Sequence, residues 1–260
     1  MVLKIFFALK FNYLSLFKKI FGKGEQLPAV DFSSIGTDLH SHLIPGIDDG
    51  AKTMDETLSL IRAQYDLGIR KFITTPHIMS DYFRNTPEII LGGLEEVRKV
   101  LKQENIDVEI NAAAEYYIDD GFVKKLENEK LLTFGNNHLL VEISYINCPD
   151  NLREIIFNIQ LHQYKVVLAH PERYPYWYKK FDEYRHLHDS GVLLQININS
   201  LTGYYGDGAK MIAEKLIDNN MVDAIGSDMH NQKHVDAMRR VCKEKYFHKI
   251  LDKNLLNRQL

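Results

Sequence analysis

Two histidines, His40 and His42, stand one residue apart at the end of a short apolar segment that we predict to be a β-strand. Because side chains alternate along a strand, both imidazoles should point to the same side. Imidazole is the commonest metal ligand in proteins, so the pair can form half of a metal site. Asp48 and Asp49 follow in a turn bounded by proline and glycine, from which their carboxylates can fold back toward the same point. The simpler alternative is a chance His-x-His pair in a loop.

Further residues of ligand type occur at or near the ends of later predicted strands. They are His77 after 71–75, Glu115 after 108–114, Glu142 within 138–143, His170 after 165–169, and Asp228 with His230 after 221–226. Taken alone, each has an ordinary explanation, except that a carboxylate such as Glu142 in an apolar strand is costly without a cation beside it. Together they can hold two or three divalent cations. Because no cysteine is among these candidate ligands, manganese, iron or zinc is favoured.

The predicted strands alternate with helices over about seven β–α units. The helices are expected near residues 53–67, 86–104, 120–129, 149–163, 181–190, 208–220 and 232–245. This alternation predicts an α/β protein with a parallel sheet covered by helices. Ligand-type residues at nearly every strand end favour a closed barrel, whose carboxyl face carries active sites, over an open sheet, which uses mainly its switch point. We therefore predict a distorted barrel of about seven strands.

Composition narrows the function classes. The chain of 260 residues is 45% hydrophobic and has a formal net charge of −3, which gives no electrostatic case for binding nucleic acid. Two cysteines argue against a disulfide scaffold and suit a reducing cytoplasm. Cys148 is a weak candidate for a phosphatase nucleophile, because Arg153 stands one residue too close for the usual Cys-x5-Arg loop.

The first segment, residues 1–22, differs from the rest of the chain. It is apolar and aromatic but is interrupted by lysines, so it resembles neither a signal peptide nor a membrane span. Its pattern is that of a basic amphipathic helix lying on a membrane surface. The alternative is a helix that packs against the domain or a partner subunit. Residues 22–31 are predicted to be a linker, so that residues 1–31 precede a domain at 32–260.

Several short motifs resemble one known family. They are Asp-Leu-His-Ser-His at 38–42, Thr-Pro-His at 75–77, Ala-Glu at 114–115, Val-Glu at 141–142, Ala-His-Pro-Glu-Arg-Tyr at 169–174 and Ser-Asp-Met-His-Asn at 227–231. The set is similar to the PHP (polymerase and histidinol phosphatase) superfamily. Together with Pro-Gly-Ile-Asp-Asp-Gly-Ala at 45–51, it resembles the bacterial manganese-dependent protein-tyrosine phosphatases of capsule and exopolysaccharide clusters. The resemblance covers about residues 36–250.

The resemblance implies a distorted (β/α)7 barrel of the PHP type with three metal ions at the carboxyl ends of its strands. By position, the implied ligands are His40, His42, Glu115 and Asp228 for one ion, Glu115, Glu142 and His170 for a second, and Asp49, His77 and His230 for the third. Asp48 is the rival to Asp49, which we prefer because family members keep an acid directly before the glycine. Two or three Mn2+ ions are expected per chain, with iron or zinc as alternatives.

The resemblance also implies how substrate is bound. Arg173 is expected to contact the substrate phosphate, because its fork matches phosphate oxygens, and the alternative is a surface ion pair with Glu172. We predict Arg173, Asp228 and His230 as catalytic residues. A second arginine that relatives often carry after Asp-x-His is missing here, and the candidates to replace it are Lys233, His234 and Arg239.

An aromatic run follows Arg173 directly. Tyr174, Tyr176, Trp177 and Tyr178 are expected either to wall a slot for the phenol ring of the substrate or to pack a loop.

The implied activity is hydrolysis of phosphotyrosine by a metal-activated water, without a covalent phospho-enzyme. The expected substrate is the tyrosine-rich tail of a bacterial tyrosine kinase that controls polysaccharide export. The expected location is the cytoplasm, at the inner face of the membrane if residues 1–22 bind it, and homo-oligomers are expected from the resemblance. The alternatives are a small-molecule phosphatase such as a histidinol phosphatase, an amidohydrolase, and a non-catalytic metal-binding scaffold. The sequence identifies no general acid for the leaving phenolate.

Overall fold

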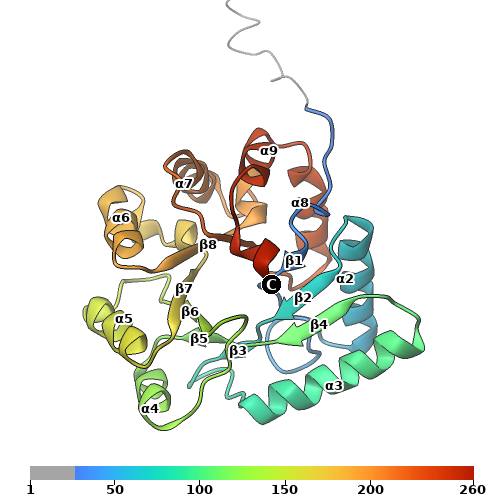
Figure 1. Ribbon diagram of the computed structural model, residues 1–260, viewed down its shortest axis with the longest axis horizontal. Helices are drawn as coiled ribbons and strands as arrows, with labels where there is room; N and C mark the ends of the chain where they lie inside the picture. The colour runs from blue at the N-terminus through green and yellow to red at the C-terminus, as the bar shows by residue number, and fades with distance from the viewer. Residues whose placement is uncertain (1–26) are drawn as a thin grey trace, which may run out of the picture.

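A computed structural model describes residues 27–260 of the chain (Figure 1). The predicted amphipathic segment 1–22 and the first part of the predicted linker lie outside the described residues. Within the described part, no helix is long and apolar enough to cross a membrane. The division of the chain at residues 31 and 32 therefore stays a prediction.

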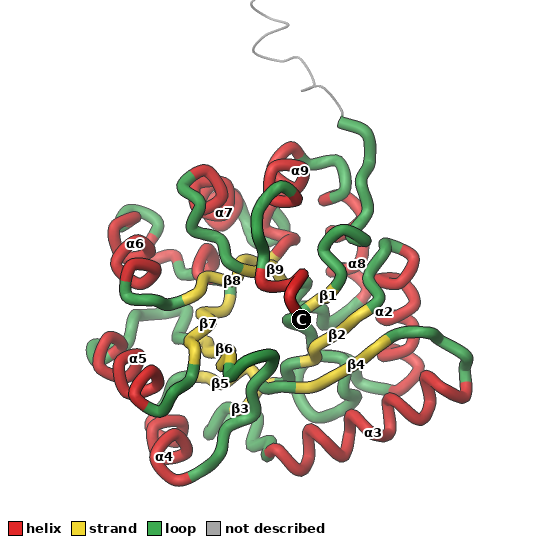
Figure 2. Tube along the Cα trace, viewed as in Figure 1, coloured by secondary structure: helices red, strands yellow, loops and turns green. Residues whose placement is uncertain are grey.

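Parallel strands form the centre of the molecule. They are β1 (Thr37–Asp38), β2 (Lys71–Thr74), β3 (His77–Ile78), β4 (Glu109–Ala112), β5 (Glu115–Tyr117), β6 (His138–Glu142), β7 (Lys165–Ala169), β8 (Leu193–Asn197) and β9 (Ala224–Gly226). They pair in two sheets, in the orders β1-β2-β4 and β3-β5-β6-β7-β8-β9. Because β3 directly continues β2 along the chain, and β5 continues β4, these nine described strands form seven strand paths. Figure 2 shows the paths as a ring with the helices outside it.

Two of the strand paths are interrupted, one at the end of the predicted strand 71–75 and the other within the predicted strand 108–114. β2 ends at Thr74 and β3 begins at His77, while β4 ends at Ala112 and β5 begins at Glu115. Pro76 has no N–H to give to a ladder, and its carbonyl instead accepts a hydrogen bond from the Glu115 N–H at 3.1 Å. The prediction that Glu115 ends a strand is thus wrong in detail, because it opens β5 in register with His77.

The ring closes between the first and last strand paths. Ser41 and Met229 form a parallel bridge just past the ends of β1 and β9. The Asp228 N–H donates to the His40 carbonyl at 2.8 Å, and the His42 N–H donates to the Met229 carbonyl at 3.0 Å. The prediction of a distorted seven-stranded α/β barrel is confirmed by this closure, and the two breaks account for the distortion.

The helices follow the strands in the predicted order and lie outside the ring (Figure 1). They are α2 (Met54–Asp66), α3 (Pro87–Gln103), α4 (Asp120–Asn128), α5 (Leu152–Leu161), α6 (Phe181–Asp189), α7 (Asp207–Asp218), α8 (Gln232–Val241) and α9 (Lys245–Leu251). Two of these helices are capped by threonine: the Thr53 hydroxyl accepts from the Glu56 N–H at 3.2 Å, and the Thr86 hydroxyl accepts from the Ile89 N–H at 3.4 Å.

The helix predicted over residues 232–245 is in fact two helices. α8 ends at Val241, and Glu244 has an extended backbone with φ −79° and ψ 132°. After this turn α9 packs Phe247, which is fully buried, against Phe32 with the ring centroids 4.5 Å apart. Because Phe32 lies more than two hundred residues away in the sequence, helical periodicity alone does not show where the chain turns.

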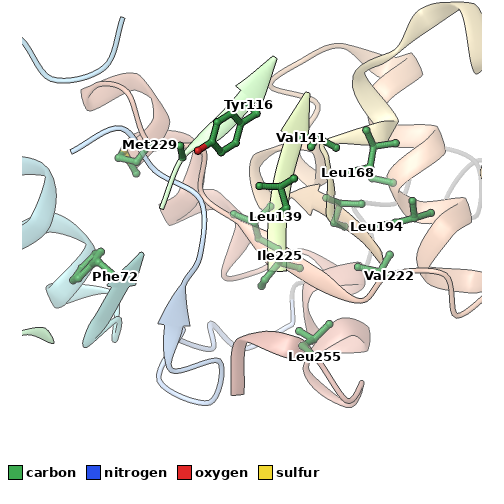
Figure 3. Packing of buried hydrophobic residues seen from close by; sticks show 14 of the residues in the cluster. Phe72, Tyr116, Leu139, Val141, Leu168, Leu194, Val222, Ile225, Met229 and Leu255 are labelled. Carbon is green, nitrogen blue, oxygen red and sulfur yellow. The ribbon is translucent and has the colours of Figure 1, made fainter. Parts of the chain in front are cut away.

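The apolar core has an inner and an outer layer. The inner cluster fills the ring and contains Leu39, Ile73, Ala113, Phe134, Leu140, Val167, Ala169 and Ala224. The outer cluster lies between strands and helices and includes Leu139, Val141, Leu168 and Leu194 (Figure 3). Along β6, Leu140 faces inward while Leu139 and Val141 face outward, so alternation places Glu142 on the inner side at the mouth of the ring.

The C-terminal residues close the opposite end of the ring. The short 3-10 helix η4 (Leu256–Gln259) lies at the centre of the view in Figure 1. Asn257 is buried, and its amide donates to the carbonyls of Thr37 and Ile225, each at 2.8 Å, while its oxygen accepts from the Ile225 N–H at 3.0 Å. This side chain therefore joins β1 to β9 at the end of the barrel opposite the Ser41–Met229 bridge.

We expect Asn257→Ala to lower the free energy of unfolding by about 2–3 kcal/mol, because it leaves three buried backbone groups without a partner. Asn254→Ala is the matched control, since Asn254 is exposed in the same segment. Urea denaturation of both variants measures the effect. Equal stability of the two variants would show that Asn257 does not hold the barrel closed.

Candidate metal centre

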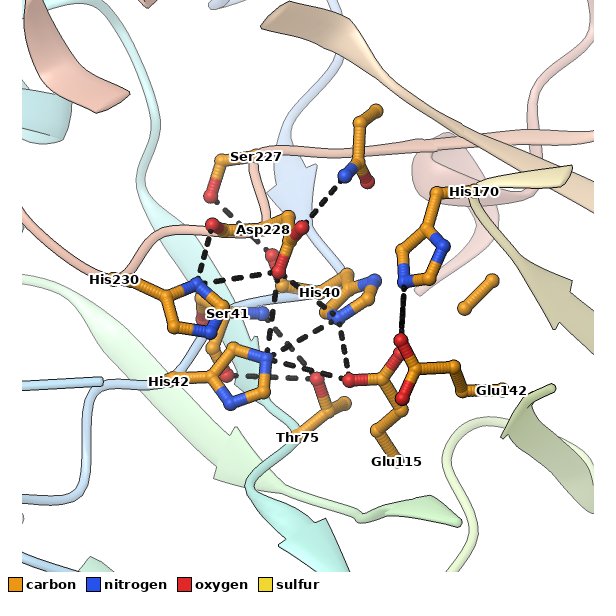
Figure 4. Close-up of polar contacts among 12 residues, drawn as sticks. His40, Ser41, His42, Thr75, Glu115, Glu142, His170, Ser227, Asp228 and His230 are labelled. Carbon is orange, nitrogen blue, oxygen red and sulfur yellow. Dashed lines mark hydrogen bonds and ion pairs between the residues drawn. The ribbon is translucent and has the colours of Figure 1, made fainter. Parts of the chain in front are cut away.

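The nine side chains predicted as metal ligands meet at the mouth of the barrel. Figure 4 labels all of them except Asp49 and His77. His40 and His42 follow β1, Asp49 lies in the turn before α2, His77 opens β3, Glu115 opens β5, Glu142 ends β6, His170 follows β7, and Asp228 and His230 follow β9. His170 and Asp228 have positive φ angles of 36° and 50°. Such a backbone is strained for residues other than glycine, and strain of this kind is concentrated at functional sites.

The ligand atoms form four overlapping groups, in each of which all atoms lie within 4.8 Å of one another. The groups are His40, His42 and Asp228; His40, Glu115 and His170; His77, Glu115 and Glu142; and His42, Asp49, His77 and His230. Glu115 belongs to two groups: its Oε1 lies 3.0 Å from His170 Nε2 in one, and its Oε2 lies 3.2 Å from His77 Nδ1 in the other. Its two oxygens can therefore bridge neighbouring cations, as the resemblance implied.

The structure gives Asp48 and Asp49 different surroundings. Asp49 Oδ1 lies 3.3 Å from His230 Nε2 and 3.5 Å from His77 Nε2, among the atoms that could hold an ion. Asp48 is buried, and its Oδ2 lies 2.8 Å from His42 Nδ1 and accepts from the His77 N–H at 3.1 Å. The geometry favours Asp49 as a ligand and shows that Asp48 orients the ring of His42.

A glycine makes this turn fit against the site. A Cβ atom on Gly50 would collide with the backbone oxygen and Cβ of His42. The Gly50 N–H also donates to Asp48 Oδ1 at 2.9 Å. The glycine of the Asp-Asp-Gly motif therefore lets the chain pass directly beside a ligand histidine.

The ionisable groups of the site are buried close together, and each shifts the pKa of its neighbours. Burial, followed by the neighbouring Glu115 carboxylate, raises the pKa of Glu142 to about 8. Burial opposes protonation of His40, yet the charges of Glu115 and Asp228 raise the pKa of this imidazole to about 9. Burial also opposes ionisation of Glu115, but His40 and His77 hold its pKa well below the usual range. The carboxylates thus favour the protonated, positively charged form of the imidazoles. Divalent cations bound among these groups would balance the negative charge without that protonation.

The donor set fits divalent cations. His77 Nδ1 is buried without a hydrogen-bond partner, although it lies 3.2 Å from Glu115 Oε2. Buried polar atoms are normally satisfied, and a cation held between this nitrogen and the carboxylates would use its lone pair. Imidazoles and carboxylates without thiolates suit Mn2+, Fe2+ or Zn2+.

A cavity of about 630 Å³ opens above the ligand cluster. Its aromatic lining comes from Tyr82, Phe83, Tyr117, Tyr145 and Tyr205, which belong to separate segments of the chain. A phenol ring of the size of tyrosine's could lie against this wall.

Of the two alternatives for the aromatic run 174–178, a slot for the phenol ring or packing of a loop, the structure shows loop packing. Tyr174 and Trp177 are buried, and the Tyr176 hydroxyl donates to the Ser144 carbonyl at 2.7 Å. None of the four aromatic residues of this run lines the cavity. They pack the loop instead, because the two short 3-10 helices η1 (Pro171–Arg173) and η2 (Pro175–Trp177) turn them toward the outer core.

Arg173 lies in the wall of the same cavity. Its Nη1 lies 2.8 Å from Asp228 Oδ2, and its guanidinium carbon lies 4.9 Å and 4.2 Å from the ring centroids of Tyr145 and Tyr205. The alternative of a surface pair with Glu172 does not match the structure. Glu172 is buried and accepts hydrogen bonds from the Asn197 N–H at 2.9 Å and the Ser200 hydroxyl at 2.6 Å.

Comparison with known proteins decides the family. The family model described as "Capsular polysaccharide synthesis, CpsB/CapC" matches residues 36–258. The chain belongs to the CpsB/CapC family.

Two curated relatives and one solved structure support this assignment. Tyrosine-protein phosphatase YwqE of Bacillus subtilis is 29% identical over 197 residues, which cover 75% of this chain and 78% of the relative. Tyrosine-protein phosphatase CpsB of Streptococcus pneumoniae is 28% identical over 200 residues, covering 75% and 82%. A crystal structure from work on YwqE and CpsB, described as unique metal-dependent tyrosine phosphatases, superposes with a TM-score of 0.73 at 26% identity, covering 84% of this chain and 95% of that one.

This CpsB/CapC chain was expected to replace a second arginine with Lys233, His234 or Arg239. Only His234 lines the cavity, and its Nδ1 accepts from the His230 N–H at 3.0 Å. Burial lowers the pKa of His234 to about 4, so the ring is neutral at physiological pH. Lys233 is exposed, and Arg239 forms an exposed ion pair with Asp236 at 3.1 Å.

Sequence reasoning missed two amide side chains on β8 of this CpsB/CapC barrel. His40 Nδ1 donates to Gln195 Oε1 at 2.7 Å, so that Nε2 faces Glu115 Oε2 at 3.2 Å and is the nitrogen that a metal ion would use. The Asn197 amide donates to Asp228 Oδ2 at 2.6 Å. Both residues are buried two positions apart, so they face the same side of β8. Polar residues at alternate positions of an otherwise apolar strand were the available signal.

Gln195→Leu is expected to weaken divalent-ion binding about 10- to 100-fold, because the orientation and tautomer of His40 are then no longer fixed. The exposed Gln103→Leu substitution at the end of α3 is the control and should bind ions as the wild type does. Competition with a metal-sensitive dye gives the affinities. Unchanged affinity of the Gln195 variant would mean that this contact does not prepare His40 for a metal ion.

Proposed function

We propose that this CpsB/CapC protein is a metal-dependent protein-tyrosine phosphatase that hydrolyses phosphotyrosine in proteins. The observation that carries the proposal is the convergence of nine ligand-type side chains beneath one cavity that also holds Arg173 and an aromatic wall. The relatives named as tyrosine-protein phosphatases support the same reaction.

Two or three Mn2+ ions are the proposed cofactor, with iron or zinc as alternatives. The residues that would hold them are His40, His42, Asp49, His77, Glu115, Glu142, His170, Asp228 and His230. When bound, such ions lower the pKa of water and neutralise charge on a phosphoryl group. The nine-residue set also speaks against a non-catalytic scaffold.

The protein's own residues bind and orient the substrate. Arg173, which we propose as a catalytic residue with Asp228 and His230, offers a guanidinium fork that matches the phosphate oxygens. The rings of Tyr145 and Tyr205 hold this guanidinium from two sides, so little side-chain freedom is lost when phosphate binds. The cavity, of about 630 Å³, has room for an aryl phosphate with its phenol ring against the tyrosine wall.

A cysteine nucleophile is not part of the proposal. Cys148 does not line the cavity, and burial followed by the charge of Glu183 raises the pKa of its thiol. A raised pKa leaves less of the reactive thiolate at neutral pH. The hydrolysis therefore does not depend on this residue.

The protein substrate, the location and the oligomeric state are proposed from the sequence. We propose the tyrosine-rich tail of a bacterial tyrosine kinase as the substrate, in keeping with a family described by capsular polysaccharide synthesis. The protein would act in the cytoplasm, with residues 1–22 contacting the inner face of the membrane, and would form homo-oligomers. Its net charge of −3 gives no reason to expect a nucleic-acid partner. A small-molecule substrate such as histidinol phosphate is the alternative.

The test measures turnover of a phosphotyrosine peptide with and without Mn2+. His42→Ala is expected to lower kcat/KM about 100-fold or more, because it removes an imidazole shared by two ligand groups. Cys148→Ser should keep the wild-type rate. Full activity after chelation of divalent ions would contradict the proposed chemistry, and a preference for histidinol phosphate would contradict the proposed substrate.

A further inference from the structure

Two surface turns each present one large apolar side chain at the mouth of the site cavity. Tyr82 is 75% exposed and Ile146 is 90% exposed, and both line the cavity together with Tyr145, which is 36% exposed. Single exposed apolar residues are ordinary on a protein surface. Here, however, three of the eight exposed large apolar residues of the described chain gather at one opening.

The turn that carries Tyr82 is firmly braced. Met79 and Phe83 exchange backbone hydrogen bonds of 2.8 Å and 3.1 Å, which close a tight loop with Tyr82 near its tip. Ser80 is held by Asp119 through two hydrogen bonds of 3.0 Å, and Phe83 stacks on the ring of His77 with centroids 5.4 Å apart. The turn is therefore fixed to the site, and its aromatic tip faces solvent.

The turn that carries Ile146 is braced in a similar way. The Ser144 hydroxyl accepts from the Ile146 N–H at 3.1 Å, and the Ser144 carbonyl accepts from the Tyr176 hydroxyl at 2.7 Å. Tyr145, next in the chain, stacks on His170 with centroids 5.7 Å apart. Ile146 thus lies one residue from a side chain that reaches the ligand cluster.

We propose that Tyr82 and Ile146 form a rim that binds apolar side chains on either side of the phosphotyrosine in a protein substrate. This inference rests on the proposed function. Tyr82 and Ile146 both line the cavity that holds Arg173 and the ligand cluster, so residues next to a phosphotyrosine in this cavity can reach both side chains. Burial of one aliphatic side chain against such a rim is sufficient for a preference of about tenfold. A small aryl phosphate has no flanking residues and gains nothing from Ile146.

The test compares three substrates in the full-length protein with Mn2+: a peptide with leucine on both sides of phosphotyrosine, the same peptide with serine there, and phenyl phosphate. We expect the wild type to prefer the leucine peptide about tenfold in kcat/KM. The double variant Tyr82→Ala, Ile146→Ala should lose most of this preference. Ile146→Ala alone, which leaves the aromatic wall intact, should weaken the preference and turn over phenyl phosphate as the wild type does. The matched control Phe157→Ala, Leu161→Ala removes one aromatic and one aliphatic exposed side chain from α5, away from the cavity, and should keep the preference.

Other outcomes would overturn the inference. A wild type that treats both peptides alike, or a rim variant that keeps the preference, would show that the rim does not select the flanking residues. A rim variant that changes only the sedimentation of the protein would make these turns a contact between copies of the chain. If the wild type hydrolysed phenyl phosphate but showed no peptide preference, the rim proposal alone would fail. If it hydrolysed none of the three substrates, the proposed function itself would fail.

Discussion

The buried charge of Glu115 is the constraint around which the mouth of the barrel is built. Its carboxylate lies within 3.2 Å of nitrogens on His40, His77 and His170, which come from three different strand paths. A carboxylate buried this fully is tolerated only with positive charge or hydrogen bonds on every side. The surrounding imidazoles provide part of this positive charge. Glu142, a second buried carboxylate, adds negative charge that also has to be balanced. We interpret this concentration of negative charge as the physical reason that the site takes divalent cations.

The irregular barrel serves that arrangement. The breaks between β2 and β3 and between β4 and β5 place His77 and Glu115 in register at the start of two short strands. A regular strand ending at either residue would leave them at the edge of the ring. The closure through Ser41 and Met229 brings His40 and His42 beside Asp228 at the other side of the mouth. The distortion is thus part of how the chain assembles a site from residues spread between positions 40 and 230.

Much of this arrangement could be predicted from the sequence. The candidate ligands were recognisable because histidines and acids are unusual at the ends of apolar strands, and helix starts such as Thr53 carry local capping signals. What could not be predicted depends on contacts between distant segments. The local sequence does not mark Gln195 as functional, because its role comes from the contact with His40 in the folded chain. The direction of the aromatic run at 174–178 is decided by the core that it meets, and the buried role of Asn257 is decided by strands near the start and the end of the chain.

The central claim is that the clustered side chains bind metal ions, and anomalous diffraction at the manganese edge from crystals grown with Mn2+ tests it most directly. Our account predicts two or three peaks inside the cluster, with neighbouring peaks on either side of the Glu115 carboxylate. A map without peaks there, or with peaks only on the outer surface, would contradict it.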